Sequence, residues 1–192
     1  GMLDPVFHYL FVSLLALVFL QGGLSKLLAH DEFLGVVNNY RILPRPLALP
    51  FSWLLPLFEL ATGVGLAFAA TRAYAAGLAV ALLFMFCVAM AINLARGRTE
   101  IDCGCFKTAF KQTISVWLIA RNLLLAGAAL ALLLPVGART VGALDAFATL
   151  AGTLMLFLAY YAAGILTRRP ATRFDAGFEH GRGPSRKGWK AL

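Results

Sequence analysis

The sequence has too few charged residues for a water-soluble protein of its length. Only 14% of its 192 residues are Asp, Glu, Lys or Arg, whereas 60% are hydrophobic. A soluble domain needs far more charge to cover its surface. The long apolar stretches also lack the period-2 alternation of a membrane β-barrel, which leaves helices as the spanning elements. Composition therefore predicts an all-α integral membrane protein.

Cysteine and histidine are scarce as well. Three cysteines, Cys87, Cys103 and Cys105, are too few for a disulfide framework. The three histidines are dispersed along the chain, which argues against a histidine metal site. The first apolar run has no basic segment before it and is too long for a cleavable signal peptide, so we expect it to remain in the protein as a helix.

Apolar runs define the expected organisation of the chain. A helix needs about 20 residues to cross a bilayer core. We expect one transmembrane domain over residues 1–167 and a basic tail over residues 168–192, whose composition predicts disorder. The segment from Phe33 to Tyr40 has helical apolar spacing and is expected to lie along the membrane interface. Five runs are long enough to span the membrane: residues 6–28, 51–70, 74–94, 114–134 and 144–166.

Lys and Arg are distributed unequally between the two ends of these spans. With five spans, fourteen of the 17 basic residues lie on the side of the first connection, the third connection and the tail. Arg72 and Arg139 lie on the other side, and Arg121 lies within a span. Because cytoplasmic loops are enriched in Lys and Arg, this bias predicts an external N-terminus and a cytoplasmic C-terminus in a bacterial inner membrane. The net charge of +8 then faces anionic lipid, and nucleic acid is not an expected partner.

Ionisable side chains inside the apolar runs are few, and each one is costly in hydrocarbon. Glu59 and Arg121 lie about 10–13 Å from the same membrane face at the helical rise of about 1.5 Å per residue, so we predict that they form an ion pair. Such a pair can fix helix register or handle a substrate or proton, and coincidence is the third interpretation. Lys26 is expected to extend its ammonium toward the same face. Cys87 is expected to be a small buried side chain, with thiol exchange as the alternative.

The connection between the third and fourth runs carries two cysteines one residue apart, in the order Asp102-Cys103-Gly104-Cys105-Phe106. Gly104 permits the tight turn that a disulfide across one residue requires, and strained disulfides exchange readily. Two thiolates can instead hold Cu(I), whereas a zinc site needs four ligands. An inert structural loop is the third interpretation. The residues favour thiol exchange by Cys103 and Cys105, with Asp102 as a supporting residue.

Further motifs accompany this loop in a fixed order along residues 10–135. Two of them precede the Asp-Cys-Gly-Cys-Phe loop, Gly23-Leu24-Ser25-Lys26-Leu27 and Leu55-Pro56-x-x-Glu59, and a third follows it, Ala120-Arg121-Asn122. With these motifs the chain resembles the methylamine-utilisation MauE family of DoxX-like membrane proteins. The resemblance implies a four-helix transmembrane bundle, to which this chain adds a fifth, C-terminal span. The loop departs from the family at Lys107, where Gly is common.

The resemblance also implies a function. It suggests an accessory membrane protein for maturation, disulfide formation or transport of the small subunit of methylamine dehydrogenase, acting with a thioredoxin-like partner. That client is periplasmic, whereas the charge bias places the cysteine loop in the cytoplasm, and we retain the charge assignment because the bias is large. A small transporter or scaffold with inert cysteines is the alternative, and a quinone-linked thiol oxidoreductase is a weaker one. No cofactor is expected, because the residues support neither quinone nor Cu(I).

Overall fold

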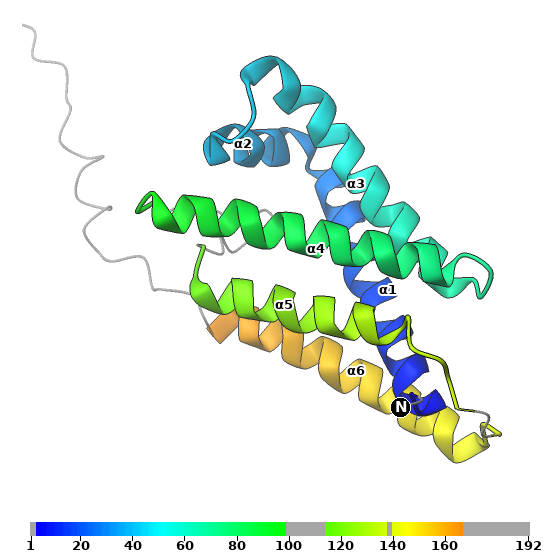
Figure 1. Ribbon diagram of the computed structural model, residues 1–192. Helices are drawn as coiled ribbons and strands as arrows, with labels where there is room; N and C mark the ends of the chain where they lie inside the picture. Colours follow the sequence, from blue (N-terminus) through cyan, green and yellow to red (C-terminus); the bar gives the residue numbers. More distant parts are fainter. Residues whose placement is uncertain (1–2, 99–113, 138–139, 167–192) are drawn as a thin grey trace, which may run out of the picture.

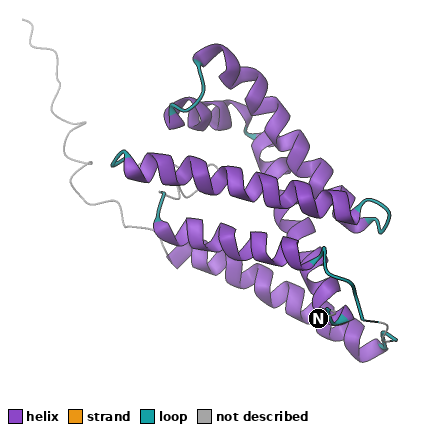
Figure 2. Cartoon of the chain, in the orientation of Figure 1, coloured by secondary structure: helices purple, strands orange, loops and turns teal. Residues whose placement is uncertain are grey.

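The structure, a computed structural model, describes residues 3–98, 114–137 and 140–166. These residues form six α-helices and no strand (Figures 1 and 2). The predicted all-helical membrane architecture is confirmed. The helices are α1 (Pro5–Leu28), α2 (His30–Tyr40), α3 (Arg45–Ala67), α4 (Arg72–Ala95), α5 (Val116–Ala131) and α6 (Ala143–Leu166).

Four of the described helices are long and apolar enough to cross a membrane. They are α1, α3, α4 and residues 143–163 of α6. With 16 residues, α5 rises about 24 Å, which is less than the thickness of a bilayer core of about 30 Å. The amides of residues 132, 133 and 134 donate to carbonyls three residues earlier and continue it as a tighter turn. The described helix is therefore shorter than the span predicted over residues 114–134, and it reaches the end of that span only with its added turn.

The first helix occupies the centre of the bundle. It packs against α3, α6, α5 and α2, while α4 packs against α5 and α3. The α3–α4 turn and the α5–α6 connection lie at the same end of the bundle as the start of the chain (Figure 1). There the amide of Leu3 donates to the carbonyl of Pro135, and the amide of Gly137 donates to the carbonyl of Leu3, both at 2.9 Å. The chain therefore alternates between two ends as the five-span topology requires.

The start of α3 differs from the predicted span. The helix begins at Arg45 and not at Phe51, directly after Pro44, whose extended conformation (φ −57°, ψ 143°) ends the preceding turn. Pro46 lies in the first helical turn. Amide groups of a first turn have no intrahelical acceptor, so a proline there removes no hydrogen bond. Pro46 is thus part of the helix, whereas Pro44 directly precedes it.

Close contact between α1 and α3 depends on two glycines. A β-carbon at Gly23 would lie 2.8 Å from the carbonyl oxygen of Pro56. At Gly63 a β-carbon would lie 2.7 Å from Cγ of Leu20 and 3.1 Å from the carbonyl oxygen of Ala16. Small residues at such positions let membrane helices approach one another closely. These contacts bring the two helices near enough for short side-chain interactions between them.

Substitution of Gly23 by alanine is expected to lower the free energy of unfolding by about 1–3 kcal/mol, because the added methyl group overlaps the carbonyl of Pro56. The matched control is Gly77→Ala on α4, where a β-carbon meets no atom within 4 Å. That control should be neutral or stabilise the protein by up to about 1 kcal/mol, because alanine favours helix. Unfolding of the purified protein in detergent measures both variants, and equal losses would contradict the prediction.

Candidate functional site

Lys26 of α1 and Glu59 of α3 form a buried ion pair. Nζ of Lys26 lies 2.8 Å from Oε1 of Glu59, and each side chain is 4% exposed. The same ammonium donates to the carbonyl of Gly22 at 3.4 Å. The rings of Phe33 and Phe86 lie beside it, each with its centroid 5.6 Å from Nζ. The Lys26 charge is therefore held by one carboxylate, one carbonyl and two aromatic rings, the last through cation–π attraction.

This pair replaces the predicted Glu59–Arg121 pair, and Lys26 does not extend to the membrane face. Helical side chains tilt toward the N-terminus of their helix. Lys26 lies in the last turn of α1, so its side chain runs back into the bundle, whereas Arg121 lies early in α5 and tilts toward the opposite direction along the bundle. Because α3 begins at Arg45 and not at Phe51, Glu59 lies six residues further along its helix than the predicted span implies.

Arg121 instead contacts α6. It is 7% exposed, and its guanidinium carbon lies 4.4 Å from the centroid of the Tyr160 ring. Its Nε and Nη2 groups make no hydrogen bond within the part of the chain that the structure describes. Stacking on an aromatic face suits a guanidinium, which is more weakly hydrated than an ammonium. Arg121 thus attaches α5 to α6 and is not the counter-ion of Glu59.

A small cavity lies beside the ion pair. Its volume is about 20 Å³, and Lys26, Glu59, Asn122 and Tyr160 are among the residues that line it. Oε2 of Glu59 and Nδ2 of Asn122 are buried and make no hydrogen bond to another described residue. A cavity of this size has room for about one water molecule. It is too small for a larger solute, so the geometry does not support solute binding at this point.

Cys87 lies in the contact between α4 and α5. The side chain is buried, and its thiol donates to the backbone carbonyl of Ile119 at 3.7 Å. This position agrees with the expectation of a small buried side chain. Thiol exchange by Cys87 stays a prediction.

The predicted reactive residues Cys103 and Cys105, and their neighbour Asp102, lie outside the described residues. The segment that leads into their loop is described, and it is fixed to the end of α4. The amide of Arg98 donates to the carbonyl of Asn93 at 3.0 Å, and its guanidinium donates to the side-chain oxygen of Asn93 at 3.4 Å. Asn93 is fully buried. The entry to the loop is therefore anchored in the bundle.

The segment that leaves the loop is anchored as well. Ile114 and Leu118 pack with Met90 of α4 in one buried apolar cluster. The amide of Leu118 donates to the carbonyl of Ser115 at 3.1 Å and begins α5. Both stems of the cysteine loop thus lie at the same end of the α4–α5 pair.

Three aromatic residues of the site are absent from the prediction. Phe33, Phe86 and Tyr160 come from α2, α4 and α6, and they surround cations from α1 and α5. No local spacing in the sequence links an aromatic residue of one helix to a cation of another. The motif that contains Lys26 was a usable signal, because it places one basic residue within an apolar, glycine-containing stretch.

Comparison with known sequences gives one consistent family. The family model described as methylamine utilisation protein MauE matches residues 5–135, which cover α1 to α5. The methylamine utilization protein MauE of Paracoccus versutus is 44% identical, over 88% of this chain and 91% of the relative. Its counterpart in Paracoccus denitrificans is 41% identical over 86% and 89%, and that of Methylophilus methylotrophus is 40% identical over 88% and 90%. No solved structure matches the chain significantly.

Replacing one partner of the ion pair, by Lys26→Met or Glu59→Gln, is expected to lower the free energy of unfolding by about 3–5 kcal/mol, because a buried group is left without its partner. The double variant should lose less than the sum, with a coupling energy of about 0.5–3 kcal/mol. A second double-mutant cycle, with Arg121→Met and Glu59→Gln, should give a smaller coupling energy. Unfolding in detergent measures both cycles, and a larger coupling to Arg121 would restore the pair that the structure replaces.

Proposed function

The chain belongs to the MauE family of methylamine utilisation proteins, and on this basis we propose that it is a membrane accessory protein that performs thiol–disulfide exchange. In this proposal Cys103 and Cys105 are the reactive pair, and a thioredoxin-like protein is the exchange partner. The client is the small subunit of methylamine dehydrogenase, whose maturation requires disulfide formation. The helical bundle holds the reactive loop at the membrane surface.

The proposal rests on one combination of features: a Cys-Gly-Cys unit in a loop whose two stems are fixed to the same end of the bundle. Asn93 anchors the entry by accepting two hydrogen bonds from Arg98, and Ile114 anchors the exit in an apolar cluster. A reactive group gains from attachment to rigid elements, because less conformational freedom is lost when a partner docks. A loop anchored in this way is a suitable carrier for an exchange site.

The chemistry balances without a further oxidant. A thiolate of the pair attacks a disulfide of the partner and forms a mixed disulfide, and one partner sulfur leaves as thiolate. The second cysteine of the pair then attacks the mixed disulfide and releases the partner as a dithiol. This protein gains one disulfide and the partner loses one, so two electrons and two protons move between them. The reverse sequence transfers a disulfide to the partner.

Solute transport by the bundle is the rival function, and little in the structure supports it. Glu59 would line a solute pocket in that case, but the cavity beside it has a volume of about 20 Å³. A fixed scaffold fits the same observation, because Lys26 and Glu59 join two helices through one short contact. We therefore assign the ion pair to the support of the loop and not to a solute pathway.

Serine at either position of the loop is expected to abolish maturation of the small subunit while membrane insertion stays normal. The two variants should differ in one respect. Serine in place of the resolving cysteine traps the mixed disulfide with the thioredoxin-like partner, whereas serine in place of the attacking cysteine prevents it. Non-reducing gels of a tagged partner detect the adduct, and Cys87→Ala is the matched control that should behave as wild type. Normal maturation in both serine variants would exclude thiol exchange.

The cysteine loop is expected to lie on the cytoplasmic side of the membrane, because fourteen of the 17 basic residues lie on the same side as the loop. A membrane-impermeant thiol reagent should therefore leave Cys103 and Cys105 unlabelled in intact spheroplasts and label them after permeabilisation. The variant Cys87→Ala removes the buried thiol from the measurement. Labelling in intact spheroplasts would reverse the assigned topology.

A further inference from the structure

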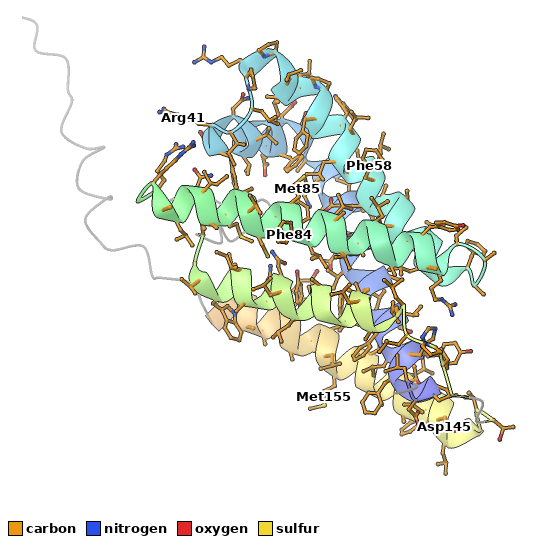
Figure 3. All side chains as sticks on the ribbon, viewed as in Figure 1. Arg41, Phe58, Phe84, Met85, Asp145 and Met155 are labelled. Atoms are coloured by element: carbon orange, nitrogen blue, oxygen red, sulfur yellow. The ribbon has the colours of Figure 1, made fainter. Side chains whose placement is uncertain are left out.

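An apolar cavity separate from the ion pair lies between α2, α3 and α4. Its volume is about 240 Å³, and its walls include Val37 and Tyr40 of α2, Leu55 of α3, and Met85 and Met90 of α4. Figure 3 shows Met85 on the side of α4 that faces α2 and α3. An apolar cavity of about 150 Å³ is known to hold benzene, so a cavity of this size has room for a longer hydrocarbon segment.

Two arginines lie at one edge of this cavity. Arg41 stands between Tyr40 and Ile42, which both line it, and ends α2 in the left-handed conformation (φ 48°, ψ 38°). The guanidinium of Arg96, at the end of α4, donates to the carbonyl of Arg41 at 3.3 Å. Both arginines are exposed. The ends of α2 and α4 therefore meet at a basic edge, and Figure 3 shows Arg41 at that end of α2.

Acidic residues of α2 lie at its opposite end. Asp31 and Glu32 are in the first turn of the helix, about 14 Å from Arg41 along the axis at a rise of about 1.5 Å per residue. They are too far away to neutralise the basic edge. Within residues 3–98, 114–137 and 140–166, no carboxylate forms an ion pair with Arg41 or Arg96. These two charges therefore lie next to a cavity that accepts hydrocarbon and have no described counter-ion.

We propose that this cavity binds one acyl chain of an anionic phospholipid, with the headgroup phosphate on Arg41 and Arg96. An apolar cavity with a cationic edge, at the end of membrane helices, matches the two parts of such a lipid. Basic pockets between membrane helices bind anionic headgroups in this way. The bound acyl chain fills the space between α2 and α4. The headgroup joins the end of α2 to the end of α4, where the segment that leads into the cysteine loop begins.

Native mass spectrometry of the full chain, released from detergent with added lipid, tests the headgroup. Phosphatidylglycerol should bind about tenfold or more tightly than phosphatidylcholine with the same acyl chains, since each arginine favours an anionic lipid by a factor of about five. The double variant Arg41→Gln/Arg96→Gln should lose this preference, and Arg41→Lys/Arg96→Lys should keep most of it. Equal binding of the two lipids to the wild type would overturn the proposed headgroup site.

The cavity itself is tested by filling it. Ala89 lines the cavity, and Ala89→Leu should reduce phosphatidylglycerol binding at least severalfold. Ala81→Leu is the matched control, because Ala81 is an exposed residue on the same helix, about two turns away. Unchanged binding to a folded Ala89→Leu variant would overturn the proposal.

A measurement on the wild type needs no folded variant. Phosphatidylglycerol with a diazirine at the end of one acyl chain should crosslink to the peptide of α4 that holds Met85 and Met90. It should do so more than the phosphatidylcholine probe with the same chain. Crosslinks that favour the exposed face of α6 around Leu154, with no difference between the probes, would show general bilayer contact only and overturn the site.

Discussion

Lys26 and Glu59 place opposite charges 2.8 Å apart inside an apolar bundle, where each charge alone would be costly. Removing a charge from water costs several kcal/mol, and attraction between the two offsets that cost only when they stay in contact. The contact in turn requires α1 and α3 to remain close, which Gly23 and Gly63 permit. The bundle can therefore not change the spacing of these helices without exposing a buried charge to hydrocarbon.

The rings of Phe33 and Phe86 connect this pair to the neighbouring helices. Each ring lies against the Lys26 ammonium on one side and lines the apolar cavity on the other. The two aromatic rings thus lie between the Lys26–Glu59 ion pair and the apolar cavity. Movement of α2 away from α4 would enlarge the cavity and remove Phe33 from the cation. The contact of Phe33 with the Lys26 ammonium and the present size of the cavity consequently depend on the same position of α2.

Much of the helical arrangement could be predicted from hydrophobic runs, because a span needs a fixed length of apolar residues whatever its neighbours are. The partner of Glu59 could not be predicted from depth alone. Depth along the bundle places Arg121 near Glu59, but the direction of each side chain depends on which way its helix runs. Lys26 tilts back toward the middle of the bundle because it lies at the end of α1, whereas Arg121, which is also buried, tilts toward the start of α5. The start of α3 could not be predicted from the apolar run alone, because Pro46 lies in a first turn whose amides have no intrahelical acceptor, and the helix also continues through Pro50 and Pro56.

The site residues on the cysteine loop could be proposed from the sequence, because only Gly104 separates Cys103 from Cys105 and no tertiary information is needed to bring them together. The aromatic residues around Lys26 could not, because they come from different helices. A contact between distant segments becomes visible in a sequence only when a motif or a charge demands a partner. The buried Lys26 ammonium requires a partner, but the sequence contains several hydrogen-bond acceptors and aromatic rings that can serve as one.

The side of the membrane on which the loop lies determines the direction of the proposed exchange. Thiols in a bacterial cytoplasm are kept reduced, whereas the periplasm is oxidising. A cytoplasmic Cys103/Cys105 pair is therefore a dithiol at rest and reduces its partner, but a periplasmic pair is a disulfide at rest and oxidises it. The basic edge at Arg41 and Arg96 lies on the same side as the loop stems, and anionic lipid is abundant in the cytoplasmic leaflet. The proposed lipid site and the charge bias share Arg41 and Arg96, and both correspond to the first case, in which the pair passes two electrons to its thioredoxin-like partner.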